Sequence, residues 1–224
     1  MSRKITVLIA DKYPIVIDTV KMAMHQLSST QNTNFEIHTA HDCENAYKKI
    51  KPSKKSKPFD VIILDINIPP SKNYDMFSGE DICIAAKKIC NKTKIIVFTS
   101  QHNNHMLYTI IKTINPEGFL LKTDTNYQNL LKALEDVING LAFYSKTIML
   151  LIRNQMSSNI VIDQMDRKIL YYLSLGTKMK DLPNKVSLSL AGIERRKRHL
   201  REVFNTTKQD DKALIESARK KGFI

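Results

Sequence analysis

Four short apolar runs in the first 125 residues are each followed by side chains that can take part in phosphoryl chemistry. Aspartates follow two of the runs, at Asp11 and Asp65, while hydroxyls at Thr99 and Ser100 and an ammonium at Lys122 follow the other two. In a parallel sheet the carboxyl ends of the strands meet at one edge, so these groups are expected to converge. Two carboxylates, a hydroxyl and an ammonium are the groups needed to form an aspartyl phosphate: a nucleophile, an acid on the metal side and two groups that contact the phosphoryl oxygens.

The elements that must position these groups follow from the alternation of apolar runs and amphipathic stretches over the first 125 residues. This alternation is typical of βα units, and runs that are apolar throughout indicate strands covered on both faces. Strands are predicted at 5–10, 35–39, 61–64, 94–98 and 118–121, helices at 14–27, 42–50, 78–90, 103–114 and 126–139, and surface loops at 51–58 and 69–77. The expected fold is an α/β doubly wound, five-stranded parallel sheet.

The motifs at the strand ends resemble those of the receiver domain of two-component response regulators, which has a flavodoxin-like fold. The similarity covers about residues 3–139 and rests on VLIAD ending at Asp11, VIILDINIP around Asp65, VFTS and GFLLK. The roles that the resemblance implies are phosphoacceptor for Asp65, metal ligand for Asp11, Asp65 and the backbone carbonyl of Asn67, phosphoryl contact for Thr99 and Lys122, and switch for Thr99 and Phe119.

One position departs from the receiver pattern. The family has two adjacent acids after the first strand, whereas Lys12 follows Asp11 here. Mg²⁺ prefers oxygen ligands, so an ammonium in place of a carboxylate removes a ligand and repels the ion. We therefore expect Lys12 to face the pocket, to offset part of the repulsion between Asp11 and Asp65, and to make Mg²⁺ binding weak or absent. The protein is accordingly expected to be wholly or partly independent of phosphorylation at Asp65.

The overall composition indicates a cytoplasmic protein with a polyanionic partner. The 224 residues include 35 Lys and Arg against 22 Asp and Glu, a formal charge of +13, which attracts nucleic acid or an anionic membrane surface. The longest apolar runs are far shorter than the roughly 20 residues of a membrane-spanning helix. The apolar run before Asp11 is also too short for a secretory signal. The sequence thus favours nucleic acid as the partner.

A basic segment near the C-terminal end supplies a surface for such a partner. The sequence SLAGIERRKRHLR, from Ser189 to Arg201, keeps apolar residues at a spacing that lets one face dock on a core while the basic face stays in water. A shorter helix predicted at 178–185 precedes it across a VSL turn, in helix-turn-helix proportions. The helices predicted for this part of the chain lie at 163–174, 178–185, 189–204 and 208–220.

Residues 160–224 resemble the LuxR/NarL-type output domain, on the skeleton DRKILYYLSLG, KDLPNKVSLSLAGIERRKRHLREVF and a final KKGFI. The resemblance implies a helix-turn-helix domain that binds DNA. Positions that can face bases are Glu194, Arg195, Arg198 and His199, and positions better placed for phosphates are Lys178, Lys180, Arg196 and Lys197. The predicted domains are a receiver at 1–139, a helical linker at 140–162 and a small all-α, four-helix domain at 163–224.

Together these features predict a DNA-binding transcription regulator of the response-regulator type, and not an enzyme. Expected partners are duplex DNA, a second copy of the chain in a homodimer, a sensor histidine kinase and RNA polymerase. Two alternatives stay open: a protein- or RNA-interaction module with a basic tail, and a metal-dependent phosphohydrolase with Asp65 as nucleophile. The hydrolase would need a second acid two residues further on, where the sequence has Asn67.

Overall fold

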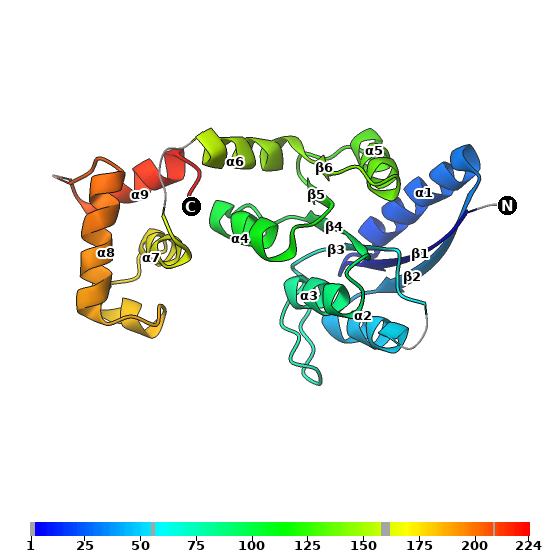
Figure 1. The fold of residues 1–224 in the computed structure, drawn as a ribbon, viewed down its shortest axis with the longest axis horizontal. Coiled ribbons are helices and arrows are strands. Elements are labelled where there is room, and N and C mark those ends of the chain that lie inside the picture. The colour runs from blue at the N-terminus through cyan, green and yellow to red at the C-terminus, as the bar shows by residue number, and fades with distance from the viewer. Residues whose placement is uncertain (1–2, 55–56, 158–161, 208) are drawn as a thin grey trace. The chain divides into compact units, whose positions relative to one another are not determined.

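The computed structural model describes residues 3–54, 57–157, 162–207 and 209–224. The chain divides into two compact units, Met1–His102 with Thr109–Met149, and Asn103–Tyr108 with Leu150–Ile224, whose elements are labelled in Figure 1. Parts of three predicted segments lie outside the described residues. These are two residues of the 51–58 loop, four residues of the 140–162 linker, and Lys208 at the start of the last predicted helix.

The first unit is built on a parallel sheet of six strands in the order β2-β1-β3-β4-β5-β6. The strands are β1 Arg3–Ala10, β2 Thr33–Ala40, β3 Val61–Leu64, β4 Lys94–Thr99, β5 Gly118–Leu121 and β6 Phe143–Tyr144. The register pairs Ala10 with Leu64 and Thr99 with Leu121. The residues that follow these strands therefore lie at one edge of the sheet.

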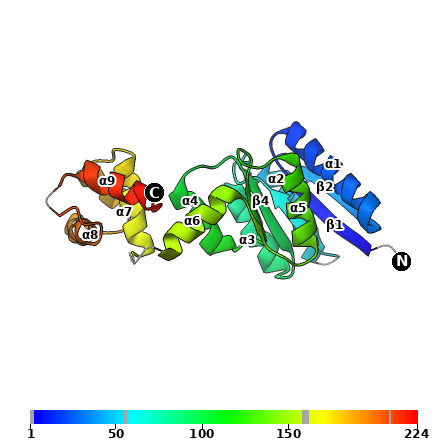
Figure 2. The ribbon, with the colours of Figure 1, turned by 90° about the horizontal axis from the view of Figure 1, so that it is seen from above.

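Helices cover both faces of this sheet (Figures 1 and 2). They are α1 Pro14–Gln31, α2 Cys43–Ile50 with the 3-10 turn η1 Lys51–Lys54, α3 Gly79–Ile89, α4 Asn104–Ile114 and α5 Tyr127–Ile138. Helix α6 Lys146–Ser157 follows β6 in the chain. Helices α1 and α5 share one apolar cluster with Ile5, Val7 and Ile9 of β1. Helices α2 and α3 pack against each other over the opposite face. The predicted α/β doubly wound class is confirmed.

The sheet has one strand more than the sequence predicts. Strand β6 pairs with β5 through Phe143 N–H, which donates to the Glu117 carbonyl, and Ser145 N–H, which donates to the Phe119 carbonyl. A strand of two residues carries no periodicity, so only its tertiary pairing reveals it. The predicted loop after β3 is also more ordered than expected, because Ser71 forms an antiparallel bridge with Met76.

The second unit is a small bundle of helices around its own apolar core. Its elements include α7 Gln164–Ser174, the 3-10 helix η2 Met179–Asn184, α8 Leu190–Val203 and α9 Asp211–Lys220. The core gathers buried residues from all four, among them Leu170, Leu182, Ile193, Leu200 and Leu214. The helix predicted at 178–185 is shorter and of 3-10 type, since Pro183 inside it has no N–H to donate.

Side-chain caps set where several helices begin, as Ser189 does for α8 by accepting from the Gly192 N–H at 3.2 Å. Helix α7 begins with a capping box in which Asp163 accepts from the amide of Asp166 and Asp166 accepts from the amide of Asp163.

Within the described residues, no helix combines the length and hydropathy needed to cross a membrane.

Candidate functional site

Two aspartates and a lysine from three strand ends meet in a closed polar cluster. Asp11 follows β1 and Asp65 follows β3, and their side chains are nearly inaccessible, at 3% and 1% exposure. The Nζ of Lys122, which follows β5, lies 2.5 Å from Asp11 Oδ2 and 2.7 Å from Asp65 Oδ2. One ammonium therefore bridges two buried carboxylates, and it offsets the repulsion that would otherwise raise the free energy of bringing them together.

The remaining carboxylate oxygens are also engaged. The Thr99 hydroxyl donates to Asp65 Oδ1 at 2.6 Å, and the Asn67 N–H donates to the same oxygen at 3.0 Å. The Tyr13 N–H donates to Asp11 Oδ1 at 2.9 Å. Each oxygen of both carboxylates thus accepts at least one hydrogen bond, which fixes the orientation of the two side chains.

The structure differs from the sequence expectation at Lys12. Its side chain is exposed, and its Nζ lies 5.0 Å from the centroid of the Tyr13 ring. No described contact joins Lys12 to Asp11 or Asp65; the ammonium that bridges these carboxylates is Lys122. Lys12 lies in the bend between β1 and α1, beside Asp11, and its long side chain carries the ammonium to the Tyr13 ring. It stands at the rim, because the Tyr13 ring that it approaches also lies 5.6 Å from Lys122 Nζ.

The other predicted residues of this pocket occupy different environments. Thr99 and Phe119 are completely buried, at the end of β4 and inside β5. Asn67 and Ser100 are exposed, and no contact to the two carboxylates is found for Ser100 among the described residues. The contacts therefore bring together Asp11, Asp65, Thr99 and Lys122, while Ser100 faces solvent at the edge.

In the second unit, three basic side chains of α8 are held by acids of the neighbouring helices. Arg196 Nη1 donates to Asp163 Oδ2 at 2.7 Å and to Asp166 Oδ1 at 2.8 Å, at the start of α7. Lys197 and Arg201 both donate to Asp211 at the start of α9, at 2.9 and 2.6 Å. These ion pairs fasten α8 to both of its neighbours.

The pKa values of the acids reflect these contacts. Burial would raise the pKa of Asp211, but the hydrogen bonds from Lys197 and Arg201 outweigh burial and hold it below its ordinary value. The same balance lowers the pKa of Asp163, where the Asp166 amide and Arg196 outweigh burial. Asp211 and Asp163 are therefore ionised at neutral pH. Their ion pairs with the basic residues of α8 weaken only when acid protonates the two carboxylates.

Arg196 and Lys197, which the sequence predicts to contact phosphates, are each paired with an acid in this structure. Both follow the buried Ile193 by about one helical turn, so they lie on the side of α8 that docks on the domain. Of the residues predicted to contact DNA, those with exposed side chains are Glu194, Arg195, Arg198, His199, Lys178 and Lys180. The sequence pattern did not identify Asp163, Asp166 and Asp211 as the partners of these cations. Their places at the starts of two helices, as the N-cap Asp163 and the first-turn acids Asp166 and Asp211, were a readable signal.

No family profile matches the chain. The oxygen regulatory protein NreC of Staphylococcus aureus is 24% identical over 233 aligned positions, which cover 97% of this chain and 98% of NreC. The solved structure of RcsB from Salmonella enterica serovar Typhimurium bound to a promoter superposes with a TM-score of 0.62 at 21% identity, covering 95% of this chain and 97% of RcsB. The chain has the fold of a two-component response regulator. The predicted resemblance to this class is confirmed.

A further solved structure covers the first unit alone. The isolated receiver domain of RcsB in the presence of the phosphomimetic BeF3⁻ matches with a TM-score of 0.53 at 24% identity, over 66% of this chain and 98% of that domain. The described part of the chain with the receiver fold thus carries the acidic cluster at the carboxyl edge of its sheet. The part that follows has the helical output-domain fold.

In this structure an ammonium of the chain itself lies between the two carboxylates of the acidic cluster. The ligands that the receiver resemblance implies are the Asp11 and Asp65 carboxylates and the Asn67 carbonyl, and no group of three or more His, Cys, Asp or Glu side chains that could hold a metal occurs among the described residues. Mg²⁺ is small and demands near-octahedral oxygen ligation. Here the Lys122 ammonium already holds one oxygen of each carboxylate, and Lys12 adds a second positive charge at the rim.

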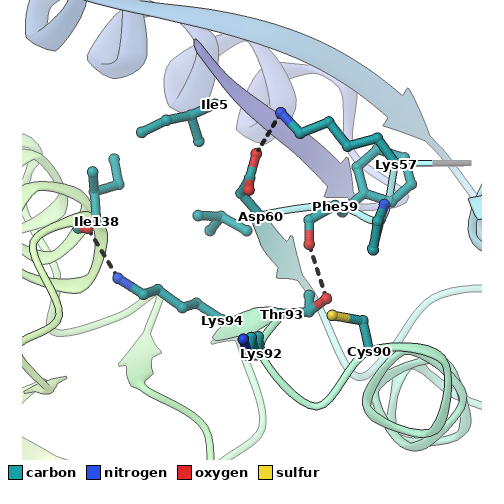
Figure 3. Close-up of a pocket in the computed structure, with 11 residues that line it drawn as sticks. Ile5, Lys57, Phe59, Asp60, Cys90, Lys92, Thr93, Lys94 and Ile138 are labelled. Atoms are coloured by element: carbon teal, nitrogen blue, oxygen red, sulfur yellow. Dashed lines mark hydrogen bonds and ion pairs between the residues drawn. The ribbon is translucent and has the colours of Figure 1, made fainter. Parts of the chain in front are cut away.

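At the opposite end of the receiver sheet lies a separate hollow of about 250 Å³, with Lys57, Lys92 and Lys94 among its lining residues (Figure 3). Its polar groups are largely engaged by their surroundings. Lys94 Nζ donates to the carbonyls of Val137 and Ile138 at 2.8 and 2.9 Å, which caps the end of α5. Lys57 pairs with Asp60 at 3.4 Å. The hollow therefore marks a structural junction between β4 and α5.

A Lys94→Met variant is expected to lower the free energy of unfolding by about 1–2 kcal/mol, because it leaves two helix-end carbonyls without their charged donor. Urea unfolding followed by circular dichroism measures the loss. Lys92→Met is the matched control, since Lys92 lines the same hollow and is exposed. Equal stability of the two variants would show that the cap contributes nothing.

Proposed function

We propose that this chain is a DNA-binding transcription regulator of the two-component response-regulator type. Its second unit holds duplex DNA, and its first unit senses a state at the acidic pocket. The observation that carries the proposal is the exposed set Glu194, Arg195, Arg198 and His199 on a helix whose inner face is fastened to α7 and α9. The activity is regulatory and not enzymatic.

The exposed set fits recognition in the major groove. Arginine can bind guanine through two hydrogen bonds and glutamate can accept from cytosine, so Arg195, Arg198 and Glu194 are suited to reading base edges. Lys178 and Lys180 are exposed at and just after the η2 cap and are suited to phosphates, which carry affinity but little sequence information. The ion pairs of Arg196 and Lys197 support this role indirectly, because they fix the orientation of α8 before DNA binds.

The acidic pocket supports Asp65 as the acceptor site. A phosphoryl group on Asp65 would meet the Thr99 hydroxyl and the Lys122 ammonium, which already lie within hydrogen-bonding distance of the carboxylate. The weak metal site limits this reaction, so the regulator acts wholly or partly without phosphorylation. Mg²⁺ binds weakly, through Asp11, Asp65 and the carbonyl of Asn67.

The partners of the proposed regulator follow from its class. Solved structures of RcsB include two dimers bound to two DNAs and a promoter complex. For this chain we expect duplex DNA, a homodimer, a sensor histidine kinase and RNA polymerase as partners, in the cytoplasm. A phosphohydrolase role gains no support, because the position two residues after Asp65 holds the amide Asn67 and not a second acid.

The proposal is tested with duplexes selected from a random-sequence library on the full chain, titrated by fluorescence anisotropy at two salt concentrations. Arg195→Ala and Arg198→Ala are each expected to weaken binding to the selected duplex by about 5-fold to 150-fold and to relax its sequence preference. Lys178→Ala and Lys180→Ala are expected to weaken all duplexes alike and to reduce the salt slope by about 1 each.

Arg196→Ala is the contrasting variant, because its side chain is bound to Asp163 and Asp166. It is expected to lower the stability of the second unit more than it changes sequence preference. Unchanged preference in both Arg195→Ala and Arg198→Ala, or selection that recovers single-stranded RNA in preference to duplex DNA, contradicts the proposed function and favours an interaction module.

A further inference from the structure

The first turn of the linker helix α6 is capped by a residue from a different part of the chain. The early N–H groups of a helix lack partners within the helix and need acceptors from elsewhere. In α6 the N–H of Thr147 donates to Asp124 Oδ2 at 2.8 Å. Asp124 lies two residues after Lys122, in the turn that follows β5. The pocket lysine and the helix cap therefore share one short turn.

That turn is tightly closed. The Asp124 N–H donates to the Leu121 carbonyl at 3.2 Å, and the Thr125 hydroxyl donates to the same carbonyl at 2.6 Å. The Lys122 N–H donates to the Thr99 carbonyl at 2.8 Å. Since Lys122 Nζ also holds Asp11 and Asp65, the turn is fixed to the acidic pocket by both its backbone and its side chain.

The residue before α6 is fastened to the same strand. Ser145 is buried, its Oγ accepts from the Leu121 N–H at 3.2 Å, and its own N–H donates to the Phe119 carbonyl at 2.9 Å. The entry to α6 thus rests on β5 directly, and Asp124 adds the charged contact at the next turn.

Charge favours this contact as well. The N-terminus of a helix carries a partial positive charge that stabilises a carboxylate. Burial would raise the pKa of Asp124, but hydrogen bonds from the hydroxyl and amide of Thr147, with smaller ones from nearby hydroxyls, hold that pKa below its ordinary value. The carboxylate is therefore ionised at neutral pH, where the cap is at full strength.

The helix that Asp124 caps continues beyond the first unit. Residues of α6 up to Met149 belong to the first unit and those from Leu150 to the second. Within the second unit, Gln155 of α6 accepts from Arg167 Nη2 at 2.7 Å and donates to the Gly222 carbonyl at 2.6 Å. The C-terminal part of α6 is thus held by contacts within the second unit.

We infer that Asp124 is a positioning residue that couples the acidic pocket to the linker helix. A change in the charge at Asp65 alters its ion pair with Lys122, and this moves the turn that contains both Lys122 and Asp124. The first turn of α6 then gains or loses the hydrogen bond from Thr147 to Asp124. This inference rests on the proposed function, since it names the route by which the first unit regulates the second.

The test is hydrogen–deuterium exchange on the full chain, read at the amides of the first two turns of α6. Asp65→Asn perturbs the pocket, and Lys122→Gln is a second perturbation in case the first leaves the turn in place. Each is expected to speed α6 exchange about fivefold, the effect of a lost N-cap. In an Asp124→Ala background α6 exchange is already fast, and the pocket variants should add less than twofold.

Asp42→Ala is the matched control background, because Asp42 caps α2 in the same unit by accepting from the Asn45 N–H. There the pocket variants should keep their full effect on α6. Thr147→Pro, which removes both the amide and the hydroxyl donor within the first turn of α6, should reproduce Asp124→Ala, and Asp124→Asn should restore part of the coupling. Amides of β1 report global unfolding.

Pocket variants that change α6 exchange equally with and without Asp124 overturn the inference, and so does a wild-type background in which neither variant affects α6. DNA affinity is titrated on the same proteins with the selected duplex. Loss of the exchange coupling with DNA binding intact rejects only the inference, whereas absence of DNA binding rejects the proposed function.

Discussion

A Lys12→Asp variant is expected to acquire a phosphoryl group on Asp65 at least about tenfold faster than the wild-type chain when both are incubated with acetyl phosphate and Mg²⁺. The substitution replaces a rim ammonium by a carboxylate beside Asp11. It therefore removes a repulsive charge and adds an oxygen donor, the two deficits that weaken the metal site. In the reaction the phosphoryl group moves from acetyl phosphate to an oxygen of Asp65, and acetate leaves.

Intact-mass measurement over time follows the addition. Lys21→Asp is the matched control, because it makes the same charge change on α1, where Lys21 pairs with Asp18 on the helix surface. It is expected to react as slowly as wild type. Rapid, stoichiometric addition to the wild-type chain, or equal rates for Lys12→Asp and wild type, would refute the role assigned to Lys12.

A Gly79→Ala variant is expected to lose about 2–3 kcal/mol of stability in the first unit. Gly79 is the first residue of α3, and a Cβ there would lie 2.2 Å from the carbonyl oxygen of Asp65 and 2.8 Å from a side-chain carbon of Leu64. Backbone atoms cannot yield as a flexible side chain can, so either α3 or the Asp65 backbone must move. The same shift should disturb the acidic pocket.

Gly192→Ala provides the control in the other unit. A Cβ at Gly192 would meet only the Ser189 Oγ at 3.4 Å, so the helical preference of alanine should raise stability by about 0.5–1 kcal/mol. Urea unfolding monitored by circular dichroism, with exchange at α3 and α8 to assign the transitions, measures both variants. A Gly79→Ala protein as stable as wild type would mean that α3 can withdraw from β3 at no cost.

Much of the first unit could be read from residue patterns alone, because buried parallel strands are local signals. The apolar runs before Asp11, Asp65 and Lys122 lie within β1, β3 and β5, and the strand-end rule placed their polar successors at one edge. Strand β6 was not predicted, because a strand of two residues shows no alternation of apolar and polar side chains. The position of the Lys12 ammonium was also not predicted. The sequence pattern shows which residue type follows a strand, but not where its side chain lies.

In the second unit the sequence pattern identified the basic helix. It could not tell which of the basic side chains are exposed and which form ion pairs within the domain. Arg195 and Arg196 are adjacent and identical in type, yet one is exposed and the other binds Asp163 and Asp166. Their difference depends on the positions of α7 and α9 around α8, which no local sequence window contains. The acids at the helix starts were visible, but their partners were not.

What the sequence by itself determined is the order and class of the elements and the chemical types at the strand ends, because apolar periodicity and capping act over a few neighbouring residues. The tertiary structure decided which groups meet. Lys122, and not Lys12, is the cation between Asp11 and Asp65, and the Asp124 carboxylate accepts a hydrogen bond from the first turn of α6. The physical reason is that an ion pair or a cap forms wherever the packed backbone brings two side chains within about 3 Å, and packing joins segments distant in the chain.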